Sequence, residues 1–209
     1  MNHATVAPAR SSDESVAARA GAYRLFARLL CEAPSEGLLR GILEQDLFGR
    51  EEQAGTEQIA LEYARLFVVP GKHVVRPYES VYCDVLTIDT STACSPYFQS
   101  EPQGIGFNGF LGGPSSVAVR EAYRQVGLEL APAAHELPDH LGVELEFMGW
   151  LLEHGQTNQA RVFFVEHLGR WVYNCVSEIK QKAHSWFYRS VAEKLECFLK
   201  DEQETLTIA

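Results

Sequence analysis

One continuous stretch, residues 135–155, most constrains the fold of this chain: H-E-L-P-D-H-L-G-V-E-L-E-F-M-G-W-L-L-E-H-G. Pro138 ends any preceding helix, because the residue before a proline is disfavoured in the α conformation. Pro138 also suits the first turn of a new helix. The residues that follow are apolar at helical spacing on two faces: Leu141, Leu145, Met148 and Leu152, then Val143, Phe147, Trp150 and Leu151. They predict a helix that is covered on most sides and ends at Gly155.

A polar cluster, Glu136, Asp139 and His140, stands where this helix begins. The free N–H groups and the dipole of a first helical turn stabilise carboxylates, so Asp139 can be a helix-start residue and His140 an interface histidine. The functional alternatives are an acid–base pair, a metal site, or a polar contact for a ligand in a crevice. The other histidines are not grouped at ligand spacing, which argues against a metal.

The rest of the chain is also predicted to be helical. Apolar spacing, caps and breakers indicate helices at 14–31, 35–43, 56–69, 79–86, 114–127, 159–168, 170–183 and 184–200. No segment has convincing strand alternation. The prediction is an all-α helical bundle of two subdomains joined by a hinge. Residues 1–13 are expected to form a disordered leader, 14–135 an N-terminal helical part with a long loop at 87–114, and 136–209 a C-terminal helical part that begins at the hinge.

Composition narrows the class of protein. The chain has 209 residues, is 46% apolar, and carries a formal charge of −10. This charge argues against binding to nucleic acid and against stable insertion in an anionic membrane. It suits a cationic partner. The five cysteines are scattered without a C-x-x-C pair, as expected in a reduced cytoplasm. No secretory signal and no apolar run of about 20 residues is present.

A second candidate site is R-P-Y-E-S-V-Y at residues 76–82. Pro77 fixes the start of a short helix, which brings Tyr78, Glu79 and Tyr82 together within a turn. Two phenols and a carboxylate can dock a peptide that has basic and apolar side chains. The alternative is that the tyrosines fill the core and that Glu79 pairs with Arg65 or Arg76. The spacing of His167 and Trp171 fits packing as well as function.

Five motifs in this order resemble the TorD/DmsD/NarJ family of redox-enzyme maturation chaperones: Y-A-R-L-F-V-V-P-G at 63–71, P-Y-E-S-V-Y at 77–82, E-L-P-D-H-L-G-V-E-L-E-F-M at 136–148, H-L-x-x-W at 167–171 and F-Y-R-S-V-A at 187–192. The resemblance covers about residues 16–200. It implies a cytoplasmic chaperone, not an enzyme. Such a chaperone binds the twin-arginine signal peptide and the apo-form of a molybdopterin-containing oxidoreductase, assists cofactor insertion and delays export.

The resemblance also implies where the signal peptide binds: Pro77, Tyr78, Glu79, Ser80, Tyr82, Glu136, Asp139 and His140. It implies no resident cofactor, although guanine nucleotide binding near the hinge has been proposed for some members. The partners would be the leader peptide and the apo-molybdoenzyme catalytic subunit, bound by a monomer or a domain-swapped dimer.

The chemistry of these residues agrees with such a ligand. Arginine favours planar carboxylates, so Glu79, Glu136 and Asp139 are its expected partners. An apolar groove for the rest of the peptide is expected on Tyr78, Val81, Tyr82 and Phe67. Two other functions stay open: a small helical nucleotide-binding or hydrolytic protein that uses Asp139 and His140, and an interaction subunit that binds only a folded partner.

Overall fold

The computed structural model of the protein describes residues 10–48, 55–88, 105–131 and 136–208. The helix expected after Pro138 is α6 (Leu141–Glu153), and it lies at the centre. Leu141, Leu145, Met148 and Leu151 on α6 are fully buried. The apolar faces of α6 therefore occupy the core, as the sequence predicts.

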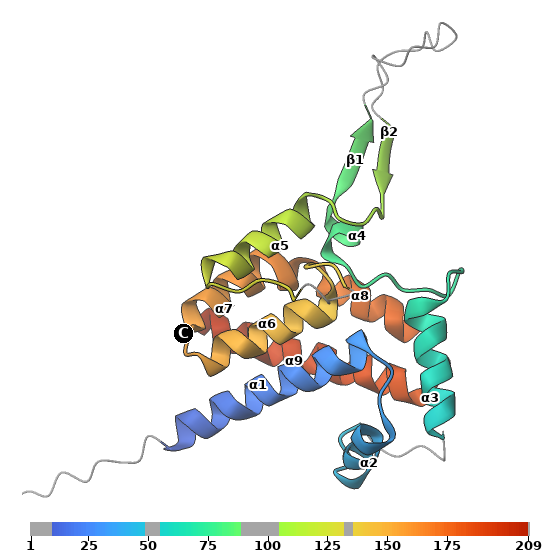
Figure 1. Cartoon of the computed structure of the whole chain (residues 1–209). Helices are drawn as coiled ribbons and strands as arrows, with labels where there is room; N and C mark the ends of the chain where they lie inside the picture. The colour runs from blue at the N-terminus through green and yellow to red at the C-terminus, as the bar shows by residue number, and fades with distance from the viewer. Residues whose placement is uncertain (1–9, 49–54, 89–104, 132–135, 209) are drawn as a thin grey trace, which may run out of the picture.

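Helix α1 (Arg10–Cys31) packs along α6 over much of its length (Figure 1). Gly142 allows this approach, because a Cβ atom there would lie 2.3 Å from Cys31 Sγ and 2.9 Å from the carbonyl oxygen of Ala27. Gly149 is similarly placed, since a Cβ atom there would lie 3.2 Å from the carbonyl oxygen of Ala20. Two glycines in α6 thus set how closely the two central helices approach.

The C-terminal helices complete the core. Helix α7 (Thr157–Phe163) continues through a π-helical turn, η3 (Phe164–Leu168), directly into α8 (Gly169–Lys182), and α9 (Trp186–Ile208) packs on α8. Gly169 is required at the π turn, since a Cβ atom would lie 2.7 Å from the carbonyl oxygen of Phe164. Helix α9 runs past the expected end at residue 200, where Glu202 forms a bidentate ion pair with Arg19 of α1.

The first part of the chain adds helices at the periphery (Figure 1). Helix α2 (Glu36–Glu44) begins as expected at Ser35, whose hydroxyl accepts the Leu38 N–H. Helix α3 (Thr56–Tyr63) passes into a second π-helical turn, η1 (Ala64–Val68), within the range predicted as one helix. Single-turn π segments occur frequently at functional sites.

A short antiparallel pair of strands projects from the helices (Figure 1). Helix α4 (Glu79–Cys83) is followed by β1 (Val85–Ile88), which pairs with β2 (Ile105–Asn108) so that Val85 faces Asn108. The prediction from the sequence was wrong here, since it extended the helix to residue 86 and expected loop at 87–114. The β-branched residues after Cys83 favour a strand, and the strand's partner lies too far along the chain for local periodicity to show.

Helix α5 (Pro114–Gln125) begins at the predicted position. Asp84, between α4 and β1, holds this start: its carboxylate accepts the Ser115 N–H at 3.0 Å and the Ser115 hydroxyl at 2.6 Å. The carboxylate thus satisfies the free donors of a helix N-terminus. It also ties α5 to the segment that carries Tyr78 and Glu79.

The all-α fold class is confirmed, because helices supply nearly all of the residues in the core. Buried residues from both sides of residue 136 form one hydrophobic cluster. The division into two parts with a hinge stays a prediction, and the expected leader falls mostly on residues 1–9, outside the described residues. Among the described helices, none combines the length and apolar character that a membrane span requires.

Candidate functional site

The structure brings together the two motifs selected from the sequence. The Glu79 N–H donates to the carbonyl oxygen of Asp139 at 2.9 Å, and the Leu141 N–H donates to that of Pro77 at 2.8 Å. Tyr78 and His140 form an isolated antiparallel bridge, and their rings lie 5.0 Å apart in an edge-to-face arrangement. The start of α4 is therefore fixed to the start of α6.

Asp139 and His140 hold this junction from inside. Asp139 is fully buried, and its Oδ2 accepts the Ser80 N–H at 3.0 Å at the start of α4. His140 Nδ1 accepts the Gly142 N–H at 3.1 Å, so the imidazole caps α6 with its proton on the other nitrogen. Burial lowers the pKa of His140 and favours this neutral form. Both side chains have a structural explanation.

Glu79 is fully buried and pairs with neither of the arginines considered from the sequence. Its Oε2 lies 3.0 Å from His167 Nδ1, and its Oε1 lies 3.9 Å from the Arg170 guanidinium. Arg65 instead pairs with Glu62, and Arg76 donates to the carbonyl oxygen of Gly109. The alternative pairing considered from the sequence was wrong, because the actual partner, His167, lies 88 positions further along the chain.

A third buried carboxyl group, Glu144 of α6, belongs to the same cluster. Its Oε2 accepts the Trp171 indole N–H at 3.3 Å. Burial, and then the charge of Glu79, raise the pKa of Glu144 well above its ordinary value, which favours the protonated form of this group. His167 and Trp171 thus contact two buried carboxyl groups, which explains their spacing.

The junction opens to the surface at Tyr78 and Glu136. The Tyr78 hydroxyl donates to Glu136 Oε2 at 2.6 Å, and both residues are half-buried. Glu136 lines a cavity of about 560 Å³, here called the Glu136 cavity. Its other lining residues combine two carboxylates with apolar surface: Glu129, Glu146, Leu128, Leu130, Val143, Phe147 and Trp150, together with Cys31, Tyr123 and Ala131.

The chemistry of the Glu136 cavity suits binding. Cys31 contributes a thiol to the lining of the cavity. Burial raises the pKa of this thiol to about 12, so it stays protonated and unreactive. In the described parts of the chain, no group of three potential metal ligands is present. The cavity therefore offers carboxylates beside aromatic and aliphatic side chains, a combination that recognises a guanidinium on an apolar chain.

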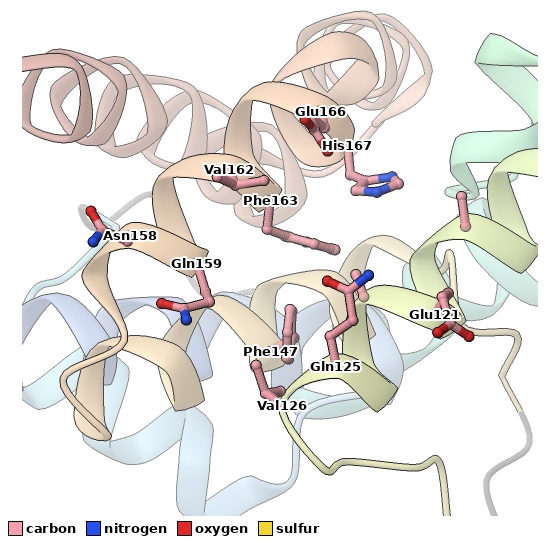
Figure 2. A pocket seen from close by; sticks show the side chains of 12 residues that line it. Glu121, Gln125, Val126, Phe147, Asn158, Gln159, Val162, Phe163, Glu166 and His167 are labelled. Carbon is pink, nitrogen blue, oxygen red and sulfur yellow. The ribbon is translucent and has the colours of Figure 1, made fainter.

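A second cavity, of about 490 Å³, lies between α5 and α7 and is here called the α5–α7 groove (Figure 2). Figure 2 shows Phe147 and Phe163 between the two helices, with His167 at one end. This groove was not predicted from the sequence. Val162 of α7, which lines this groove, is 47% exposed in the structure.

Comparison with known proteins decides the family. Residues 30–177, most of the chain, match the model of the nitrate reductase delta subunit family. The chain belongs to this family.

The proteins similar to this chain include a chaperone. The chaperone protein TorD of Shewanella pealeana is 24% identical over 149 residues, which are 71% of this chain and 61% of that protein. The match thus spans less than two thirds of its relative. A crystal structure described as a putative redox enzyme maturation protein from Archaeoglobus fulgidus covers 94% of this chain and 99% of its own, with 22% identity and a TM-score of 0.49.

In this member of the nitrate reductase delta subunit family, the predicted site residues differ in exposure. Glu136 and Tyr78 reach the surface, whereas Pro77, Glu79, Ser80, Asp139 and His140 are buried. Tyr82 is half-buried. Its ring stacks on Trp171 with 5.4 Å between ring centroids, and its hydroxyl donates a hydrogen bond to Glu178.

The apolar groove predicted on Tyr78, Val81, Tyr82 and Phe67 involves rings that have partners within the protein. Phe67 packs against Tyr63 and Tyr188, at 5.3 and 5.6 Å between ring centroids. Peptide binding at these residues stays a prediction.

Proposed function

We propose that this protein is a cytoplasmic chaperone, not an enzyme, that binds the twin-arginine signal peptide and the apo-form of a molybdopterin-containing oxidoreductase. In this role it assists cofactor insertion and delays export of its client. Family membership supports the chaperone class. The choice of ligand is supported by the Glu136 cavity, in which carboxylates lie beside apolar surface at the junction of the two motifs.

The arginine pair of the leader would enter the Glu136 cavity. Glu136, Glu129 and Glu146 line it and supply the negative charge that two guanidinium groups require. The Tyr78 hydroxyl holds the Glu136 carboxylate in place, so part of the orientation is set before the peptide arrives. The overall charge of −10 adds long-range attraction for a cationic segment.

The buried residues of the site would position this surface without touching the peptide. Asp139 and Glu79 are fully buried and engaged with Ser80 and His167, so we assign the guanidinium contact to Glu136 and its neighbours. Leu141 and Glu79 are tied by backbone hydrogen bonds to Pro77 and Asp139, which fixes Tyr78 relative to the cavity. Replacement of Asp139 would then weaken peptide binding indirectly, because it would destabilise the junction between α4 and α6.

A matched pair of variants tests this assignment. Glu136→Gln removes one charge from the cavity, and Glu193→Gln removes one from the exposed surface of α9. Calorimetric titration with a synthetic twin-arginine leader should show binding about 10- to 100-fold weaker for Glu136→Gln, since a charged hydrogen bond contributes about 1.5–3 kcal/mol. Glu193→Gln should bind like the unaltered protein. Equal weakening by both variants would reduce the role of Glu136 to general electrostatics.

A further inference from the structure

The α5–α7 groove has an apolar floor, and exposed apolar side chains stand on its walls. Phe147 and Phe163 form the floor (Figure 2), and Ala122 of α5 and Val162 of α7 also line the groove. Val162 is 47% exposed although it lines a concave surface. Ala118, one turn before Ala122, is also exposed. The surface is therefore shaped to bury apolar side chains of a ligand.

The rim of the groove is acidic or neutral. Glu121 on α5 and Glu166 on η3 belong to opposite walls, and the amides of Gln125, Asn158 and Gln159 line the groove towards the start of α7 (Figure 2). None of the described residues that line it is a lysine or an arginine. An occupant with apolar side chains and no acidic groups would meet both the floor and the rim favourably.

The groove and the Glu136 cavity adjoin at Phe147 and at the end of α5. Phe147 lines both, and Val126 lines the groove while Leu128 lines the cavity. The Cα atoms of Val126 and Leu128 are two residues apart, hence at most about 7.6 Å apart. Between them Gly127 turns the chain with φ +81°. Two or three residues of an extended peptide, at about 3.3 Å each, would cross this distance.

A second connection joins the two sites through the buried cluster. His167 lines one end of the groove, and its Nδ1 lies 3.0 Å from Glu79, the residue that follows Tyr78. The π turn η3 sets the position of His167 and Glu166 at the groove. Both the wall and the floor of the groove are thus fixed to the same junction as the Glu136 cavity.

We propose that the apolar segment of the twin-arginine leader lies in the α5–α7 groove while its arginine pair occupies the Glu136 cavity. This inference rests on the proposed function and adds the place of the uncharged part of the ligand. From Ala118 to Gln125 the α5 wall is about 10 Å long at 1.5 Å per residue. It matches about two helical turns of the leader, or three extended residues.

One exposed valine inside the groove and one outside it supply a matched test. Val162→Asp places a charge among apolar side chains, and Val68→Asp makes the same change on η1, where the valine is 60% exposed. Fluorescence titration with a full leader should give a Kd about tenfold weaker for Val162→Asp and an unchanged Kd for Val68→Asp. Ala118→Asp, on the opposite wall, should behave like Val162→Asp.

A second peptide separates this inference from the proposed function. A leader that keeps both arginines but has serine in place of its apolar residues should bind the unaltered protein and Val162→Asp equally. No binding of the full leader to the unaltered protein would refute the proposed function. Tight binding of the full leader that is unaffected by Val162→Asp and Ala118→Asp, or that is weakened only by Val68→Asp, would overturn the placement in the groove alone.

Discussion

Replacement of Glu144 by glutamine should stabilise the protein increasingly as pH rises. Glu144 is fully buried in α6, and burial together with the charge of Glu79 raises its pKa well above the ordinary value. In the folded state this carboxyl group stays protonated above pH 4.5, where it would ionise in the unfolded chain. The group therefore contributes most stability at low pH, and this contribution is lost as pH rises towards its folded pKa.

The magnitude follows from proton linkage. Between the unfolded and folded pKa of Glu144, the unfolded state binds one proton fewer, so the free energy of unfolding falls by about 1.4 kcal/mol for each pH unit. Glutamine is close to glutamic acid in shape and cannot ionise. The free energy of unfolding of Glu144→Gln minus that of the unaltered protein should therefore rise with about this slope above pH 4.5.

Urea unfolding followed by circular dichroism at half-unit pH steps measures this difference. Glu146→Gln, two residues along α6 and exposed, controls for the loss of a carboxylate from the same helix. Its difference from the unaltered protein should stay nearly constant over the same range. A constant difference for Glu144→Gln as well would refute the account of Glu144 as a neutral buried acid.

Two further predictions concern the helix junctions. Gly142→Ala should lower the free energy of unfolding by about 1–3 kcal/mol, because its Cβ would overlap Cys31 Sγ and the Ala27 carbonyl. Gly21→Ala in α1 has no atom within 4 Å of the added Cβ, so it should raise the free energy of unfolding by up to about 1 kcal/mol. Thermal unfolding that shifts in the same direction for both variants would contradict the packing argument. Asp139→Asn should cost about 1–3 kcal/mol in urea unfolding by weakening the bond to Ser80 N–H, and an unchanged midpoint would count against its capping role.

Local sequence patterns predicted most of the helices because their determinants are local. Apolar residues at helical spacing place α6 in the core, and Ser35 and Pro114 mark the starts of α2 and α5. The β1–β2 pair was missed because its hydrogen bonds join segments separated by residues 89–104. No local period reports such a pairing.

Local motifs also allowed part of the candidate site to be selected from the sequence. The two motifs carry recognisable residues, so Tyr78 and Glu136 could be selected from the sequence. The burial of Glu79 and Asp139 could not be predicted, because their partners come from elements far along the chain. The Glu79–His167 pair and the α5–α7 groove both depend on how α7 packs against α5 and α6.

The most direct test of the central claim is calorimetric titration of the unaltered protein with a twin-arginine leader and with the same leader carrying two lysines. A guanidinium binds a carboxylate through two parallel hydrogen bonds, which an ammonium group cannot reproduce. The account predicts tight binding of the arginine peptide and at least about tenfold weaker binding of the lysine peptide. Equal affinities for the two peptides, or no binding of either, would contradict it.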